Sequence, residues 1–287
     1  MKRLKDVDMS KYTTFRAGGR AAELVLIDNE EELVQVTQVV RQSGREFMMM
    51  GNGSNLLFTD GGYQGIVLKL QGDFCTMRVE NDRLIVGSGV LMSQVASRAL
   101  AEGLTGFEFA SGIPGSIGGA LFMNAGAYGG EMKDIVVSAR VMRKDLTIAE
   151  IPAEEMELGY RHSNFQEDDG VVLSVTLQLA KGDPETIAAQ MKELAGKRNA
   201  KQPVQYPSAG SFFKRPEGFF AGKLIQDAGL KGVSVGGAQV SPLHSGFVIN
   251  TGGATATDII TLMHLVQETV YDRFQVRLEP EVRIIGD

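Results

Sequence analysis

The chain has 287 residues, of which 43% are hydrophobic and 22% are charged, so it can bury a core and two domains are expected from its length. Its formal net charge of −6 argues against nucleic acid and acidic membrane surfaces as general partners. The single cysteine, Cys75, excludes an internal disulfide framework. With one cysteine and three widely spaced histidines, the sequence predicts no metal site. Glycine is in excess, at 35 residues, and no periodic or low-complexity tract accounts for it.

The first 70 residues combine helix and strand signals. A short apolar strand at residues 24–27 precedes a helix. Asp28 and Glu31 have the spacing of a capping box, apolar residues then recur at helical spacing, and Gly44 suits the end of the helix. Further strands are expected at residues 47–50 and 66–70.

Strand signals dominate the middle of the chain, with one helix that we expect to be capped by Ser93 and stopped by Gly103. Asp183 and Pro184 predict the start of another helix, which runs through Lys197. A last helix is expected at residues 257–274. The remaining strands are expected at residues 83–86, 136–142, 171–179 and 282–285, and segment boundaries near residues 70 and 183.

The N-terminal residues are charged and lack the apolar stretch of a signal peptide. No apolar run approaches the roughly 20 residues that span a bilayer. We therefore expect a cytoplasmic protein that does not bind membranes.

Two glycine-rich stretches are the strongest candidates for a binding site. Residues 51–55 (GNGSN) follow a predicted strand, and successive backbone N–H groups in such a loop can bind an anion; a simple tight turn is the alternative. A third glycine is missing for a Rossmann fingerprint, because Leu56 stands at its position. Residues 111–131 hold seven glycines among small and apolar side chains, which indicates ordered backbone against a flat or charged ligand, or close packing of backbone on backbone.

Together the two stretches suit a cofactor with a pyrophosphate and a large planar ring, as in FAD. Six blocks of sequence, in the same order along nearly the whole chain, resemble the MurB family of UDP-N-acetylenolpyruvoylglucosamine reductases. They are residues 12–19 (YTTFRAGG), 50–57 (MGNGSNLL), 112–120 (GIPGSIGGA), 159–165 (GYRHSNF), 209–214 (AGSFFK) and 278–283 (LEPEVR).

The resemblance implies an α+β fold of the vanillyl-alcohol-oxidase (PCMH) type. Residues 1–70 and 71–182 would form two FAD-binding subdomains, the first completed by the C-terminal strand, and residues 183–287 a substrate domain. It further implies that NADPH reduces FAD and that hydride then passes to an enolpyruvyl ether, giving UDP-N-acetylmuramate, in a protein of the family's shorter form that we expect to be a monomer. The cofactor-binding residues that it implies are Gly51, Asn52, Gly53, Ser54, Asn55, Leu56, Gly112, Pro114, Gly115, Ser116, Gly119, Asn124, Gly126 and Ala127.

Three residues carry the reaction if the resemblance holds. Ser211 resembles the residue that protonates C2 of the enol intermediate, although a buried serine bonded to backbone is the alternative without the resemblance. Arg161 would hold the substrate carboxylate with its guanidinium fork. Glu281, which we expect to be a buried carboxyl with a raised pKa opposite Arg161, would stabilise the enolic intermediate or assist protonation.

A basic segment supports an anionic substrate. Residues 192–231 hold eight basic and three acidic side chains inside an acidic chain, although a solvated helix face would look similar. The substrate-binding residues implied there and nearby are Arg198, Lys201, Lys214 and His244, although a hydrogen-bonded surface histidine is the alternative for His244. Arg215 departs from the family, since many relatives carry asparagine at its position.

Two other functions stay open at this stage. One is a flavin oxidase of the same fold, although its covalent flavin attachment would need a histidine or cysteine in the glycine-rich loops, and Cys75 lies outside both. The other is a nucleotide-binding module without catalysis, which would need the loops but not Arg161, Ser211 and Glu281 together.

Overall fold

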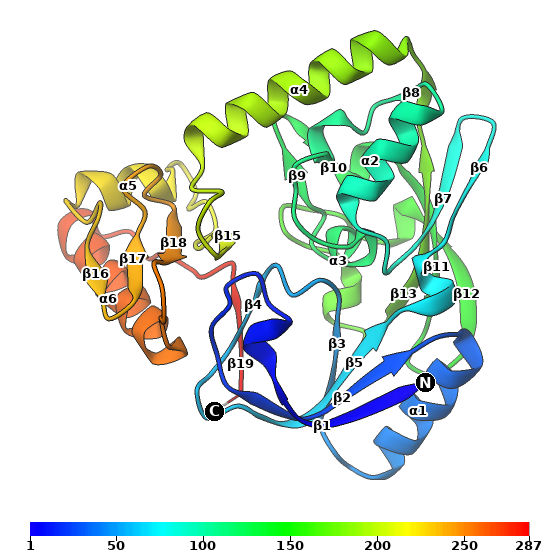
Figure 1. Ribbon diagram of the computed structural model, residues 1–287, viewed down its shortest axis with the longest axis horizontal. Coiled ribbons are helices and arrows are strands. Elements are labelled where there is room, and N and C mark those ends of the chain that lie inside the picture. Colours follow the sequence, from blue (N-terminus) through cyan, green and yellow to red (C-terminus); the bar gives the residue numbers. More distant parts are fainter. Residues whose placement is uncertain (287) are drawn as a thin grey trace. The chain divides into compact units, whose positions relative to one another are not determined.

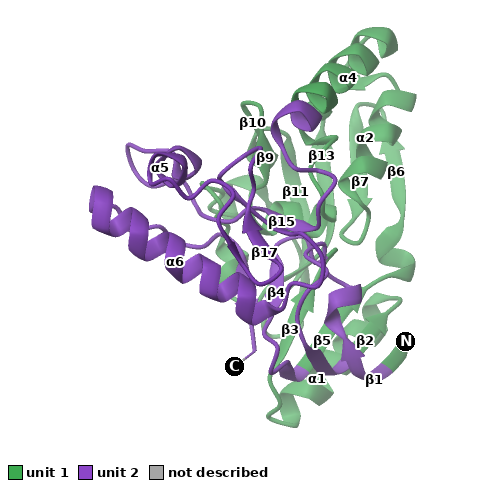
Figure 2. Ribbon diagram, turned by 60° about the vertical axis from the view of Figure 1, so that its left-hand side comes forward, with its two compact units in different colours: residues 1–3, 24–52, 66–197 green, residues 4–23, 53–65, 198–287 purple. Residues whose placement is uncertain are grey.

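The computed structural model describes residues 1–286, which pack as two compact units (Figures 1 and 2). Unit 1 comprises residues 1–3, 24–52 and 66–197, and unit 2 comprises residues 4–23, 53–65 and those from 198 onward. The chain therefore passes between the units several times. The division into segments 1–70, 71–182 and 183–287 stays a prediction.

Unit 1 contains an antiparallel sheet of five strands. Their order is β12 (Ile148–Pro152), β11 (Val136–Met142), β13 (Val171–Gln178), β7 (Arg83–Gly87) and β6 (Met77–Glu80). Helices α2 (Met92–Ala101) and α3 (Ile117–Phe122) bury their apolar side chains against it, in a core that includes Leu84, Val95 and Leu121. The strands predicted at residues 83–86, 136–142 and 171–179 are confirmed as β7, β11 and β13.

Helix α2 begins one residue before Ser93, at Met92, so the predicted cap is wrong. Leu91 holds the N-cap position, and the Gln94 side chain accepts a hydrogen bond from its N–H at 3.1 Å. Two short antiparallel pairs complete this part of the chain. They are β8 (Leu104–Thr105) with β14 (Ala180–Lys181), and β9 (Gly126–Ala127) with β10 (Gly130–Glu131).

A second sheet has the strand order β1 (Lys2–Asp8), β2 (Arg20–Ile27), β5 (Tyr63–Leu70) and β3 (Phe47–Met50), with β3 parallel to β5. Helix α1 (Glu30–Gln42) packs its apolar side chains into the same core as residues 25–27 and 66–70. Asn29, and not Asp28, caps this helix, since its side chain accepts from the Glu32 N–H at 2.9 Å. The predicted helix is therefore confirmed and its predicted cap is wrong by one residue.

Unit 2 is built on an antiparallel sheet of four strands in the order β15 (Ser208–Ser211), β18 (Phe247–Asn250), β17 (Ala238–Val240) and β16 (Ser234–Val235). Helices α5 (Ala221–Asp227) and α6 (Ala256–Phe274) enclose its core, which also takes in Phe15 and Phe212. The C-terminal strand β19 (Arg283–Ile285) pairs in parallel with β4 (Leu56–Phe58).

Helix α4 (Pro184–Lys201) carries the chain from one unit to the next, and the division falls between Lys197 and Arg198. It begins as predicted, with the Asp183 carboxylate accepting from the Thr186 N–H at 2.9 Å, and it extends four residues beyond the predicted end. Among residues 1–286, no helix combines the length and the apolar character needed to cross a membrane.

Candidate active site

The two glycine-rich loops touch each other within unit 1. A Cβ built on Gly51 would lie 2.5 Å from Ser116 Oγ, well inside van der Waals contact. Lys69 of β5 donates a hydrogen bond from Nζ to the Gly51 carbonyl. Burial lowers the pKa of Lys69, and the charge of Cys75 partly opposes that shift. A partly buried amine therefore lies beside the first loop.

The second loop contributes α3 and two buried hydroxyl groups. Ser116 precedes α3, and its Oγ is buried without a hydrogen-bond partner in the described part of the protein. The same is true of Ser88 Oγ, and a Cβ on Gly118 would come 2.7 Å from the Ser88 Cβ. A buried hydroxyl without a partner is unfavourable by about 1–3 kcal/mol. These residues fit the pyrophosphate of FAD, whose oxygens would accept from both hydroxyls.

The glycines of the second loop differ in what they leave room for. Gly112, Pro114 and Gly115 form the turn before α3, where Gly115 has a φ of +142° and its carbonyl accepts from Met92 N–H at 3.0 Å. A Cβ on Gly119 would meet only Ser116 Oγ, at 3.6 Å. The protein therefore leaves space above Gly119, as cofactor binding there would need.

Asn124 is engaged within the protein. It is buried, has a φ of +40°, and donates from Nδ2 to the Gly159 carbonyl at 2.8 Å and to Glu131 Oε2 at 3.0 Å. Gly126 of β9, which precedes Ala127, has no room for a side chain, because its Cβ would lie 2.7 Å from the Gly130 carbonyl. Cofactor contacts from Asn124, Gly126 and Ala127 stay predictions.

The first loop ends in unit 2. Asn52 is the last residue of unit 1 in this stretch, and Gly53 has a φ of +64° with its carbonyl accepting from Thr14 N–H at 3.2 Å. Ser54 lies before Asn55, whose Nδ2 donates to the Glu281 carbonyl at 2.9 Å. Leu56 is buried at the start of β4. The side chain of Asn55 thus supports the segment that carries Glu281.

Arg161 lies at a tight turn of unit 1. Gly159 and His162 exchange two backbone hydrogen bonds, of 3.1 and 3.2 Å, and Arg161 between them has a φ of +54°. A non-glycine residue in this conformation is uncommon and is often found at functional sites. Its guanidinium lies 5.1 Å from the centre of the Tyr160 ring. The predicted carboxylate-binding arginine therefore has a strained backbone that its surroundings must hold.

Ser211 and Glu281 lie on neighbouring segments of unit 2. Ser211 ends β15, just after Gly210 with a φ of +78°, and the phenylalanines that follow it are buried. The Glu281 N–H donates to the Phe212 carbonyl at 2.8 Å, and the Glu281 side chain is partly buried. The roles of Arg161, Ser211 and Glu281 in catalysis, and a raised pKa for Glu281, stay predictions.

The predicted substrate contacts of unit 2 are cationic or polar. Arg198 and Lys201 lie on the last turn of α4, and Lys214 pairs loosely with Glu279, Nζ to Oε2 at 3.5 Å. The Arg215 guanidinium lies 4.7 Å from the centre of the Phe220 ring, which is 63% exposed. Whether Arg215 contacts the substrate stays a prediction.

The surroundings of His244 favour its neutral form. Its Nδ1 accepts a hydrogen bond from the Gly246 N–H at 3.0 Å, so the ring proton lies on Nε2. Burial lowers the pKa of His244, while a backbone hydrogen bond has the opposite effect. His244 would therefore serve a substrate as a hydrogen-bond donor and not as a cation.

Sequence reasoning missed two residues beside the glycine-rich loops, namely Lys69 and Ser88. Lys69 had a visible signal, because it is the one charged residue in the apolar strand at residues 66–70. Ser88 had no such signal, because its place beside Gly118 results from folding.

Comparison with known proteins covers nearly the whole chain. Residues 21–151 match the family model described as an FAD binding domain, and residues 202–285 match the C-terminal domain of UDP-N-acetylenolpyruvoylglucosamine reductase. The reductase of that name from Clostridium perfringens (strain SM101 / Type A) is 50% identical over 98% of this chain and 92% of its own length. The reductase from Alkaliphilus oremlandii is 46% identical over 99% of this chain and 93% of its own length.

A crystal structure of the enzyme from Thermus caldophilus superposes with a TM-score of 0.87 at 36% identity, covering 99% of this chain and 98% of that one. The predicted fold class is confirmed by this match together with the two domain matches.

Proposed function

The chain belongs to the UDP-N-acetylenolpyruvoylglucosamine reductase family, and on that premise we propose that it is the FAD-dependent, NADPH-using reductase that converts UDP-N-acetylenolpyruvoylglucosamine to UDP-N-acetylmuramate for peptidoglycan synthesis. The observation that carries this proposal is identity of 46–50% along almost the full length of both chains. The unpartnered hydroxyls of Ser88 and Ser116 support the cofactor independently of the comparisons.

Unit 1 provides the residues that would hold FAD. The oxygens of its pyrophosphate would accept from Ser116 and Ser88, and the space above Gly119 lets the cofactor approach the backbone. Bound FAD supplies the chemistry of taking hydride from NADPH and passing it to C3 of the enolpyruvyl group.

The chain's own residues manage charge and protons. Arg161 holds the substrate carboxylate through two parallel N–H bonds, and so stabilises the negative charge that spreads onto it as hydride adds. The Ser211 hydroxyl then gives its proton to C2, which completes the addition of two hydrogens across the double bond. Glu281 acts beside Ser211 on the enolic charge.

The substrate's diphosphate requires cations, which unit 2 supplies. Arg198, Lys201 and Lys214 would contact it, with His244 as a neutral donor. We place Arg215 with them, because its guanidinium can bind phosphate oxygens where an asparagine would offer one amide.

We further propose that the protein works as a monomer in the cytoplasm. Light scattering during gel filtration measures the first, and a fluorescent fusion in living cells locates the second. A stable dimer would contradict the monomer, and signal at the cell envelope would contradict the location.

The decisive experiment follows the flavin spectrum. The purified protein should be yellow, lose its colour with NADPH in the absence of oxygen, and regain it when UDP-N-acetylenolpyruvoylglucosamine is added. Mass spectrometry should then detect a product with two more hydrogens than the substrate. Protein that stays colourless after incubation with FAD would refute the proposal, and reoxidation by oxygen but not by the enolpyruvyl compound would favour an oxidase.

A further inference from the structure

Two side chains hold the strained Arg161 turn from opposite ends. Asn124 donates to the carbonyl of Gly159, which opens the turn, at 2.8 Å. Gln166 donates from Nε2 to the carbonyl of Arg161 itself, at 3.0 Å. Since the direction of that carbonyl depends on the backbone angles of Arg161, the Gln166 bond favours the left-handed conformation in which Arg161 is found.

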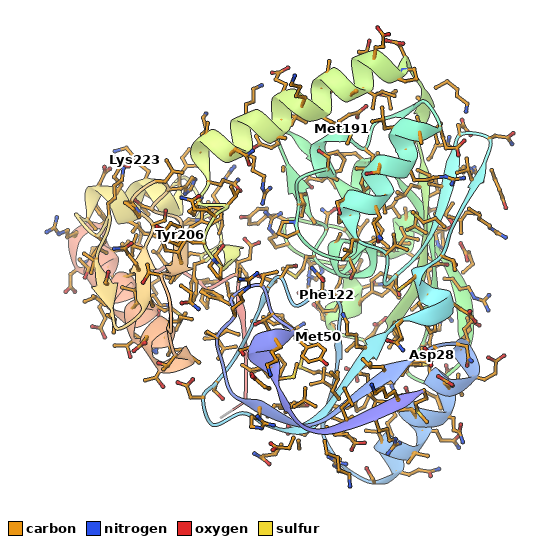
Figure 3. All side chains as sticks on the ribbon, viewed as in Figure 1. Asp28, Met50, Phe122, Met191, Tyr206 and Lys223 are labelled. Atoms are coloured by element: carbon orange, nitrogen blue, oxygen red, sulfur yellow. The ribbon has the colours of Figure 1, made fainter. Side chains whose placement is uncertain are left out.

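Gln166 also ties this turn to the second glycine-rich loop. Its Nε2 donates to the carbonyl of Phe122 at 2.9 Å, and the buried Ser163 donates from Oγ to the same oxygen at 2.7 Å. Phe122, labelled in Figure 3, is the last residue of α3. An amide nitrogen has two hydrogens, so one side chain bridges two carbonyls that belong to different segments.

The two carbonyls that Gln166 bridges lie close to the second glycine-rich loop, because α3 is short. Helix α3 has six residues, or about 9 Å at 1.5 Å per residue, and Ser116 precedes its first residue. The segment that would bind the cofactor phosphates and the arginine turn are therefore fixed to the two ends of one short rigid element.

We infer that Gln166 is a positioning residue for the reduction of the enolpyruvyl substrate. By joining the Arg161 turn to α3, it sets where the Arg161 guanidinium meets the substrate carboxylate. This inference rests on the proposed function. Gln166 itself is exposed and packs no core, so its substitution leaves the fold intact. Asn124 is buried and less suited to a test for that reason.

The charge of Arg161 also acts on Glu131. The pKa of Glu131 is lowered by a hydrogen bond from Lys133 first, then by one from Asn124, and also by the charge of Arg161. The positive charge of Arg161 thus acts on the Glu131 carboxylate, which also accepts a hydrogen bond from Asn124.

The test compares Gln166→Met, which keeps the size of the side chain and removes both donors, with Gln166→Lys, whose ammonium restores them. Gln190→Met, an exposed substitution on α4, is the matched control. Stopped-flow spectra follow flavin reduction by NADPH and reoxidation by the enolpyruvyl substrate separately. Misplacement of a substrate-orienting group by an ångström can slow a reaction about a hundredfold.

In Gln166→Met we expect reoxidation to slow by about tenfold to a hundredfold. The KM for the enolpyruvyl substrate should rise, while reduction, flavin content and Tm stay at the parent values. Gln166→Lys should recover part of the rate, and Gln166→Met should add nothing in an Arg161→Ala background. Normal reoxidation in Gln166→Met, or equal slowing of both half-reactions, would overturn the inference.

Arg161→Lys separates this inference from the function on which it rests. Slow reoxidation in Arg161→Lys with a normal rate in Gln166→Met refutes the role of Gln166 alone. Normal reoxidation in both refutes the proposed role of Arg161 as well. Failure of the parent protein to bleach with NADPH refutes the proposed function itself.

Discussion

The main-chain N–H of Glu281 donates to the carbonyl of Phe212 at 2.8 Å. This bond joins the two segments of unit 2 that carry the proposed proton donor and the proposed acid beside it. An antiparallel bridge between Phe213 and Pro280, and a bond of 2.9 Å from the Lys214 N–H to the Glu279 carbonyl, extend the same pairing. Ser211 and Glu281 are therefore anchored by backbone, so that substituting either side chain leaves the other's main chain in place.

The first prediction concerns Ser211. Its proton is needed only after hydride has reached the enolpyruvyl group, so Ser211→Ala should bleach with NADPH at nearly the parent rate. Reoxidation by substrate should fall by about 10²–10⁴-fold, the usual contribution of a general acid. Stopped-flow measurement of both half-reactions tests this.

Ser211→Cys is the informative companion, because a thiol can still give a proton from the same place. It should recover part of the lost rate. If both half-reactions slow equally in Ser211→Ala, the residue shapes the site and donates no proton. An unchanged rate of reoxidation by substrate in Ser211→Ala would assign the proton to Glu281 or to water.

The second prediction separates neighbouring glycines of α3. Gly119→Val should fold normally but lose flavin, because a side chain there meets little protein and would occupy cofactor space. Gly118→Val should instead destabilise the fold by about 1–3 kcal/mol or more, since its Cβ would collide with Ser88. Flavin absorbance and chemical denaturation distinguish the two effects. Normal flavin content in Gly119→Val would show that this glycine faces no cofactor.

The third prediction concerns the buried hydroxyl of Ser116. Without flavin, Ser116→Ala should be as stable as the parent or more stable by about 1–2 kcal/mol, because it removes a polar atom that has no partner. Its Kd for FAD should rise about tenfold to a hundredfold, the value of a hydrogen bond to a charged group. Denaturation of the flavin-free protein and fluorescence titration with FAD measure the two quantities. The exposed Ser93→Ala on α2 is the control, and unchanged FAD affinity in Ser116→Ala would rule out a phosphate contact.

Periodicity was enough to predict helices α1, α2, α4 and α6 and seven of the strands, whereas the fold class came from the resemblance to a known family. The reasons for the wrong helix caps are local. The helix after Asp28 was predicted from its apolar repeat, but two adjacent residues, Asp28 and Asn29, could each cap it, and only the folded contacts select Asn29. The apolar repeat likewise could not show that Leu91 precedes α2, because its cap uses the Gln94 side chain.

Site residues could be predicted where they lie close together in a sequence motif. They could not be predicted where their contacts form only on folding. The glycines of the loops stand close to one another in sequence, so a cofactor site could be predicted there, and that role stays a prediction. Gln166 donates to the main-chain carbonyl oxygens of residues 122 and 161. Every residue has such a carbonyl, so no residue type in the sequence signals the contact. The conformation of Arg161 was hidden for the same reason, since arginine has no sequence preference for a positive φ.

The fourth prediction is a pH dependence of stability that originates at His244. Burial lowers the pKa of His244 in the folded protein, and its Nδ1 must stay unprotonated to accept from the Gly246 N–H. Because the folded pKa lies below that of the unfolded chain, the unfolded chain binds more protons in the window between them. The stability contributed by the neutral ring is therefore fully present above the ordinary value of about 6.5, and is lost as the pH falls through the lowered pKa.

His244→Gln keeps a hydrogen-bond acceptor and does not titrate. The free energy of unfolding of the parent, compared with this variant, should be independent of pH above about 7 and decline as the pH is lowered below about 6.5. Urea denaturation from pH 8 to pH 5 measures it, and an NMR titration should place the His244 transition on the acid side of an ordinary histidine. His264→Gln, on the exposed side of α6, controls for the loss of one histidine. A parent protein that gains stability over the variant as the pH falls would mean that His244 is charged in the fold, and would contradict the prediction.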